Sequence, residues 1–271
     1  MGKRSGEAAM TEMTPKEFRG LVREGKWTDG TEMVCRGYAQ ANVAILPRET
    51  ALAFLTFCIR NPRPCPVMDV TDPGNPHPKL IAPGADLRTD LPKYRVFEKG
   101  KIVSEPTDIT EYWRDDLVAF LLGCSRSFEW ALRDANVRFR FLGAYSTNIP
   151  CIPAGIFHGP MVVTCRLVKG AHDAVRAIQI CSRHLFSHGA PVHIGDYEKI
   201  GIKDLYNPDM GRSDLSEGAI ALQEPDEIAF FWGCGVTPQA VAMATRPSLM
   251  ITHFPGCMLV ADKLSSELVA L

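Results

Sequence analysis

Residues 227–239 read EIAFFWGCGVTPQ, an apolar run that ends at a glycine-flanked cysteine and continues into a threonine-proline pair. The apolar run predicts a buried strand. Thr237 is the expected N-cap of a following helix, with Pro238 at its first position, where no amide donor is needed. A strand, a glycine-bearing turn and a helix N-terminus are typical of the anion-binding corner of an α/β protein. We therefore expect an α/β fold with Cys234, Thr237 and Gln239 at a substrate site.

A sharp turn at the start of a new helix is predicted at GCS, residues 123–125, which interrupts helical patterns over 114–122 and 127–135. Unpaired amides at a helix N-terminus favour a thiolate over a thiol. Cys124 is therefore expected to have a lowered pKa and to act as an acid or a nucleophile, with a packed residue at a tight junction as the alternative. For Cys234, between two glycines, the packing role is the stronger interpretation.

The rest of the chain alternates helix and strand patterns. Thr14 and Glu17 form a capping box that starts a helix, which Gly25 ends. Residues 49–59 predict a nearly all-apolar, buried helix, and residues 94–103 predict a hairpin in an outlying flap. Further strands are expected over residues 43–46, 67–70, 137–141, 161–168, 249–252 and 257–261, and a further helix over 171–181.

A length of 271 residues suits a main domain that carries a smaller one. The strands around residues 137–168 and the helix after them form a β-rich unit that could be the smaller domain. We therefore predict a discontinuous main domain over residues 1–135 and 205–271, with a smaller α/β domain over residues 136–204.

Composition excludes several classes of protein. The chain has 30 Lys plus Arg against 31 Asp plus Glu, which gives no broad electrostatic footprint for nucleic acid or an anionic membrane. Its apolar runs are too short to span a bilayer, and nine cysteines without a Cys-x-x-Cys pair indicate reduced, mostly buried thiols. No secretory signal and no nucleotide fingerprint is present. We expect a cytoplasmic protein without a cofactor, and leave open whether it is a homo-oligomer.

The loop HGAPVHIGD, residues 188–196, concentrates two imidazoles and a carboxylate. Such groups suit acid-base chemistry or metal ligation. The five-residue spacing of His188 and His193 fits no helical metal motif, so we favour proton transfer and predict no metal site.

Several other polar side chains are candidates for the site. Arg88 and Arg166 have the guanidinium fork that binds a carboxylate, although surface arginines are common. Asp116 and Glu129 flank the Gly-Cys-Ser turn and could act in acid-base catalysis, although acidic residues near a helix start also suit the helix dipole. Further candidates for substrate contact are Gln40 and Asn42, which precede an apolar strand, and His253.

Seven separated segments, in order along nearly the whole chain, resemble the hydro-lyase family that includes D-glutamate cyclase. They are GYAQAN (37–42), RNP with CP (60–66), DLRTDLPKY (86–94), GCS with FE (123–129), HGAPVHIG (188–195), GCGVTPQ (233–239) and THFPG (252–256). The resemblance implies a three-layer α/β/α domain with a smaller α/β domain. It also implies interconversion of D-glutamate and 5-oxo-D-proline, with loss of water on ring closure.

Ring closure needs a neutral amine, an activated carboxyl group and a donor for the leaving hydroxyl. With this chemistry, His188 or His193 would transfer protons, and Arg166 or Arg88 would bind the α-carboxylate. The amides of residues 234–237 would bind the developing oxyanion. Two alternatives stay open at this stage: a lactam or amide hydrolase that forms a thioester at Cys124, and a carboxylate-binding module without turnover.

Exhaustive chelation is expected to leave the activity intact, because only the loop of residues 188–196 offers clustered ligand side chains and its spacing is poor. The measurement is turnover before and after dialysis against EDTA. Stoichiometric metal in the purified protein, lost together with activity on dialysis, would contradict this expectation.

Overall fold

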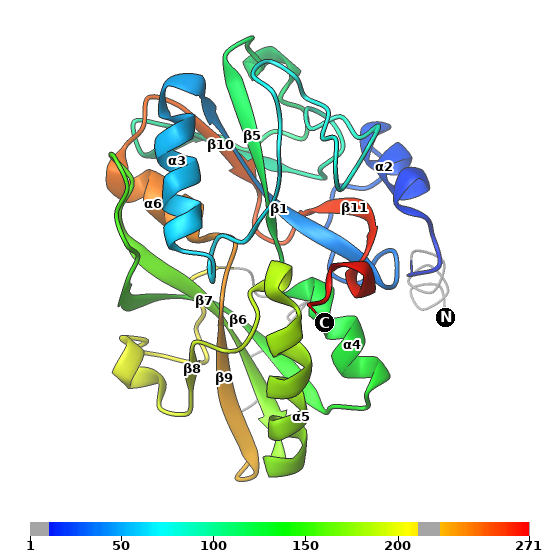
Figure 1. The fold of residues 1–271 in the computed structure, drawn as a ribbon, viewed down its shortest axis with the longest axis vertical. Coiled ribbons are helices and arrows are strands. Elements are labelled where there is room, and N and C mark those ends of the chain that lie inside the picture. The colour runs from blue at the N-terminus through cyan, green and yellow to red at the C-terminus, as the bar shows by residue number, and fades with distance from the viewer. Residues whose placement is uncertain (1–10, 211–222, 271) are drawn as a thin grey trace.

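The structure, a computed structural model, describes residues 11–210 and 223–270, which form two antiparallel sheets and five α-helices (Figure 1). The larger sheet contains β1 (Tyr38–Pro47), β2 (Val67–Val70), β3 (Tyr94–Glu98), β4 (Lys101–Ser104), β5 (Leu117–Gly123), β10 (Met250–His253) and β11 (Leu259–Leu264). Its strand order is β2-β5-β1-β10-β3-β4, and β11 also pairs with β1. The long strand β1 is therefore the hub of the larger sheet.

The smaller sheet has the strand order β6-β7-β9-β8. Its strands are β6 (Phe139–Pro150), β7 (Pro160–Lys169), β8 (His193–Ile194) and β9 (Glu227–Gly233). The helices are α2 (Pro15–Arg23), α3 (Arg48–Arg60), α4 (Arg126–Asp134), α5 (Gly170–Arg183) and α6 (Thr237–Thr245), and short 3-10 turns are η1 (Thr110–Tyr112), η2 (Leu185–Ser187), η3 (Tyr197–Ile200) and η4 (Ser265–Leu268).

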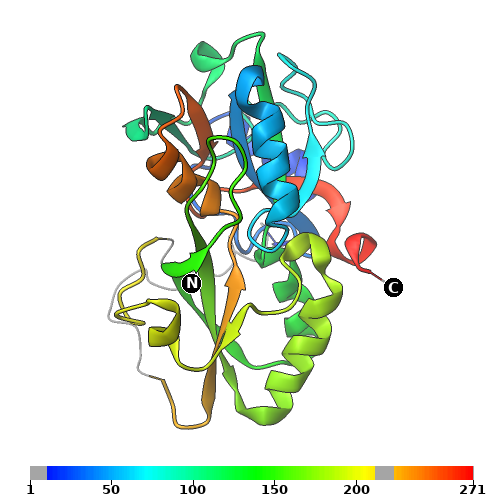
Figure 2. The ribbon, with the colours of Figure 1, turned by 60° about the vertical axis from the view of Figure 1, so that its left-hand side comes forward.

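Each sheet is covered by helices that bury aromatic side chains. Phe54 and Phe57 of α3 pack with Phe120 of β5 on one face of the larger sheet, and α6 joins them there. Phe128 of α4 packs beside Trp232 of β9, with their ring centroids 5.4 Å apart, and α5 completes this layer. Figure 2 shows α5 on one side of the smaller sheet and the η3 segment on the other. Mixed α/β architecture is thus confirmed, while the three-layer arrangement stays a prediction.

The segment 114–122 was expected to be helical, but most of it lies in the central strand β5, so that prediction is wrong. Every residue of β5 is buried, and β5 pairs with both β1 and β2. A strand buried on both faces is a continuous apolar run, and periodicity alone cannot distinguish it from a buried helix.

Two other predictions need correction. The helix α3 is not buried all round, because Leu52 is 75% exposed and only Phe54, Phe57 and Cys58 are buried. The hairpin of β3 and β4 exists, but it is no outlying flap, because β3 pairs with β10 inside the larger sheet. Contacts between distant segments determine both the burial of α3 and the place of the hairpin, and the local sequence pattern does not show them.

Strand pairing in the two sheets suggests domain limits that differ from those predicted from the sequence. Strand β9 follows residue 204, yet it pairs with β7 and β8 in the smaller sheet. Helix α4 precedes residue 136, yet it packs in the core of that sheet. We therefore propose that the smaller unit includes both α4 and β9. Within the described residues, no helix is long and apolar enough to cross a bilayer.

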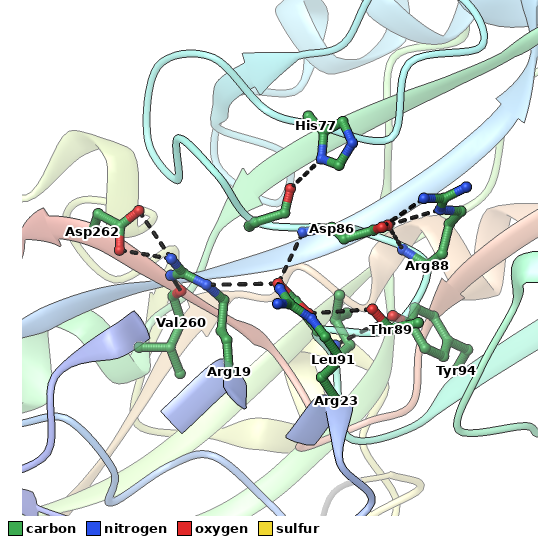
Figure 3. A network of polar contacts seen from close by, with 12 residues as sticks. Arg19, Arg23, His77, Asp86, Arg88, Thr89, Leu91, Tyr94, Val260 and Asp262 are labelled. Carbon is green, nitrogen blue, oxygen red and sulfur yellow. Dashed lines mark hydrogen bonds and ion pairs between the residues drawn. The ribbon is translucent and has the colours of Figure 1, made fainter. Parts of the chain in front are cut away.

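A buried ion network holds α2 against the larger sheet (Figure 3). The Asp90 carboxylate, which is fully buried, accepts hydrogen bonds from Arg23 Nε at 2.8 Å, from Arg23 Nη2 at 2.7 Å and from the Asp86 amide at 2.8 Å. Arg19, also buried, donates to the Val260 carbonyl oxygen and to Asp262. Charges in this position need partners, because an unpaired buried charge is strongly destabilising.

Replacing Asp90 by Asn is expected to lower the free energy of unfolding by about 3 kcal/mol, because Arg19 and Arg23 would lose their buried counter-charge. The measurement is urea denaturation followed by circular dichroism. Asp72→Asn is the matched control, since its ion pair with Lys79 is exposed and should contribute less than about 1 kcal/mol. Equal losses in both variants would contradict the assignment.

Candidate active site

A pocket of about 380 Å³ opens between residues contributed by both sheets. This volume is within the range of small-ligand sites. The polar and charged side chains among its lining residues include Glu32, Asn42, Lys93, Cys124, Ser125, Arg126, Thr164, His188, Cys234 and His253.

Two strand-turn-helix corners form the walls of the pocket. Strand β5 ends at Gly123 and α4 begins at Arg126, while β9 ends at Gly233 and α6 begins at Thr237. Neither helix has a side-chain N-cap hydrogen bond, so each presents backbone amides at its N-terminus. Thr237 is therefore not the N-cap that the sequence predicted. Its hydroxyl instead accepts from the Val162 amide at 3.0 Å and donates to the Cys234 carbonyl oxygen at 2.7 Å.

Close packing fixes both corners. A Cβ atom at Gly123 would lie 1.4 Å from the Phe186 carbonyl oxygen, and one at Gly233 would lie 2.7 Å from the Arg63 carbonyl oxygen. Asn42 of β1 lies between the corners, because its Nδ2 donates to the Gly123 carbonyl oxygen at 2.7 Å and a Cβ at Gly235 would lie 2.0 Å from the same atom. Only glycine fits at these three positions.

His188 presents an unprotonated nitrogen to the pocket. Its Nδ1 lies 2.6 Å from the Arg63 carbonyl oxygen, which can only accept, so Nδ1 carries the proton of the neutral ring. Burial lowers the pKa of His188 to about 4, and the Nε2 atom has no hydrogen-bond partner among the residues that the structure describes. Nε2 therefore has the lone pair of a general base at neutral pH.

His253, on β10, presents its Nε2 atom to the same pocket. The Val43 amide donates to His253 Nδ1 at 3.2 Å, which places the proton of the neutral ring on Nε2. The Val43 carbonyl oxygen also lies 3.4 Å from Nδ1, a contact that would require the proton on Nδ1. It is longer than the contact with the Val43 amide, so the tautomer with the proton on Nε2 is assigned. Burial lowers the pKa of His253 to about 4, and Nε2 has no partner. The two histidines thus differ: His188 Nε2 can accept a hydrogen bond, and His253 Nε2–H can donate one.

Charged groups surround these imidazoles. The Arg126 guanidinium lies 3.8 Å from the centroid of the Phe141 ring, and the Lys93 ammonium lies 4.2 Å from that of Phe254. Burial raises the pKa of Glu32, and the buried Glu32 Oε2 has no hydrogen-bond partner. The pocket therefore has two cations and a carboxyl group that is more easily protonated than an exposed one.

Three cysteines line the pocket, Cys124, Cys234 and Cys257, and the two at the Gly-Cys corners test the sequence expectations. The prediction of a lowered pKa for Cys124 is wrong, because complete burial raises the pKa of Cys124 despite a backbone hydrogen bond from Arg126. Burial likewise raises the pKa of Cys234 to about 12. Desolvation of the thiolate outweighs the helix N-terminus here, so both residues are thiols at neutral pH.

Five of the thirteen side chains proposed from the sequence line the pocket: Asn42, Cys124, His188, Cys234 and His253. Others lie behind its wall and hold it in place. Gln40 bonds with Thr31, and Gln239 links Arg95 to the His253 carbonyl oxygen. Arg166 and Glu129 form a buried ion pair, with Arg166 Nη2 2.6 Å from Glu129 Oε1.

The remaining candidates are not among the pocket residues. Arg88 pairs with Asp86, and Asp116 pairs with Arg114. The His193 Nε2 atom lies 2.7 Å from the Asp196 carbonyl oxygen, and its ring packs beside Phe231.

Sequence reasoning missed Glu32, Lys93, Arg126 and Thr164 as pocket residues. Two of them lie in or beside segments that were already singled out: Lys93 lies inside the DLRTDLPKY segment, and Arg126 directly follows Gly-Cys-Ser. Glu32 and Thr164 had none, since only the folded chain places them at the corners.

The unfolding free energy is expected to fall as the pH decreases from 6.5 to 4. His188 and His253 have a pKa near 4 when folded and near 6.5 when unfolded, so in this range the unfolded chain binds more protons. The stabilising contribution, on the order of 3 kcal/mol per histidine, is complete above pH 6.5. Denaturant titrations at pH 7, 5 and 4 measure it. His188→Gln should make the unfolding free energy less dependent on pH, whereas replacement of the exposed His172 by Gln should leave that dependence unchanged. Equal slopes in the wild type and both variants would contradict the prediction.

Comparisons with known proteins give a family. The D-glutamate cyclase family model matches residues 118–262. Relatives named "Putative hydro-lyase" are 51% identical in Bacillus licheniformis (93% of this chain, 96% of the relative), 49% in Geobacillus kaustophilus (94% and 97%) and 49% in Bacillus subtilis (96% and 100%). A solved nitrogen repressor-like protein from Methanococcus jannaschii aligns at 8% identity with a TM-score of 0.37, too low to indicate a shared fold. The resemblance found in the seven segments is confirmed, and the chain belongs to the D-glutamate cyclase family of hydro-lyases.

Proposed function

We propose that the protein interconverts D-glutamate with 5-oxo-D-proline and water. The observation that carries this proposal is the pair of buried histidines whose Nε2 atoms have no hydrogen-bond partner in the described part of the chain and which line one small pocket. One accepts a proton and the other donates one, which is the pair of functions that ring closure requires.

In the forward reaction, the substrate amine attacks the side-chain carboxyl carbon. His188 Nε2 removes a proton from the amine, and a C–N bond forms. The Glu32 carboxyl group, when it holds a proton, gives that proton to the departing hydroxyl, the His253 Nε2–H group donates a hydrogen bond to the same oxygen, and the C–O bond breaks with release of water. Because the pKa of Glu32 is raised by burial, that carboxyl group can hold a proton nearer to neutral pH than an exposed one.

The substrate's negative charges have two sets of partners. Arg126 and Lys93 are the cations of the pocket and suit the α-carboxylate, in place of the Arg88 and Arg166 suggested by the sequence. Backbone amides at the starts of α4 and α6 suit the oxyanion that develops on the side-chain carboxyl. The reaction needs no redox partner and no nucleotide, and we place it in the cytoplasm.

The raised thiol pKa values argue against the alternative of a thioester at Cys124, since a buried thiol is a weak nucleophile. The chemical groups in the pocket also exceed the needs of a carboxylate-binding module. A panel of amino diacids tests this directly: binding without product would favour the module.

Purified protein is expected to form 5-oxoproline from D-glutamate without ATP or NAD, measured by liquid chromatography. His188→Gln should lower kcat about 100-fold or more, because the amine would lose its proton acceptor. His193→Gln is the control from the same loop and should retain turnover, since His193 is not among the residues that line the pocket. Loss of turnover in the His193 variant alone would move the proton transfer to that residue.

A further inference from the structure

The two corners of the pocket have the same local structure. Each is a buried strand, a Gly-Cys pair and a nine-residue helix, and each cysteine sulfur accepts a backbone hydrogen bond from the residue two positions later, Arg126 or Val236. One corner ends a strand of the larger sheet and the other ends a strand of the smaller sheet. The two thiols therefore approach the same pocket from two walls.

The two cysteines line one pocket and are held in place. Cys124 is among the groups whose charge acts on the Cys234 thiol, and Asn42 contacts both corners. Gly123 and Gly233 have no space for a side chain, so neither turn can shift easily. The nearby His188 and His253 Nε2 atoms, which are buried and have no hydrogen-bond partner among residues 11–210 and 223–270, independently mark this space as one that receives a polar ligand.

We propose that Cys124 and Cys234 form a two-thiol acid-base pair that exchanges the Cα proton of the bound amino acid or lactam and inverts its configuration. The proposal rests on the proposed function for its substrate class. It adds an activity, since ring closure itself leaves the Cα–H bond untouched.

The step balances in protons and electrons. At neutral pH both sulfurs are thiols, so the reactive form arises when one of them passes its proton to His188 Nε2, which leaves one thiol and one thiolate. The thiolate takes the Cα proton, so a C–H bond breaks, an S–H bond forms and the electron pair moves into the adjacent carboxyl group. The opposite thiol gives its proton to the other face of Cα. No oxidant or reductant is consumed, and either sulfur can serve as base, depending on the hand of the ligand.

The surroundings suit this use of the thiols. Burial raises the pKa of both sulfurs, and the positive charges of Arg126 and Arg166 oppose that rise at both. A thiolate of raised pKa is a stronger base than an ordinary one, and the guanidinium groups supply its counter-charge. Arg126 and Lys93, which suit the α-carboxylate, can stabilise the enediolate that forms transiently on that group.

The test uses 5-oxo-D-proline and D-glutamate in D2O, with chiral chromatography and mass spectrometry at early times. The expected result is deuterium at Cα of the product of opposite hand, while recovered starting material stays unlabelled, because two different groups remove and return the proton. Deuterium in the recovered starting enantiomer would instead indicate a single base and overturn the proposal. Cyclisation without any Cα deuterium would also overturn it and leave the proposed function standing. Deuterium exchange at Cα without cyclisation would support the two-thiol pair and contradict the proposed function.

Variants assign the exchange to the sulfurs. Cys124→Ser and Cys234→Ser should each lower label incorporation about 100-fold or more. Cys35→Ala is the matched control, because Cys35 is fully buried beside α2 and outside the pocket. Thermal melts establish that each variant is folded, and Cys→Ala variants replace any that is not. Wild-type exchange rates in both pocket variants would remove the thiols from the reaction.

Discussion

The buried ion pair between Arg166 and Glu129 is the contact on which the site depends. Arg166 is fully buried on β7, in the smaller sheet, and its Nε and Nη2 atoms lie 2.9 and 2.6 Å from Glu129 Oε1. The same Nη2 atom donates to Ser125 Oγ at 3.0 Å. Ser125 lies in the turn after Gly123, where strand β5 of the larger sheet ends. One guanidinium therefore fastens a strand of one sheet to the end of the other, directly behind the pocket.

This network also determines the charge of the pocket. Burial acts to raise the pKa of Glu129, but the charges of Arg126 and Arg166 hold it below its usual value. Two guanidinium groups against one ionised carboxylate leave a positive surplus beside the pocket. The starts of α4 and α6 add partial positive charge from their amides. An anionic ligand is thus favoured at this place although the whole chain is almost neutral, with a net charge of -1.

The sequence predicted the parts of this site that are local and missed those that depend on distant contacts. Both Gly-Cys corners could be predicted, because a glycine turn between apolar and helical patterns is written in a few adjacent residues. The strand β5 was misread because its buried residues have no period of two. Arg166 was taken for a substrate clamp because no sequence pattern shows that Glu129 folds onto it. Glu32 was missed since it reaches the pocket from the loop of residues 28–32, which lies outside the segments singled out in the sequence.

The same tight packing explains why chemistry of this kind can be held in such a small space. A buried imidazole without a partner destabilises a fold, and two of them in one pocket do so together. The surrounding structure offsets this cost with ion pairs behind the wall and with glycines that leave no room for the corners to relax. Within the described residues, the His188 and His253 Nε2 atoms therefore have hydrogen-bonding capacity that a ligand can satisfy. The pocket is therefore preorganised for a small polar molecule, and the binding of that molecule satisfies groups that folding leaves unsatisfied.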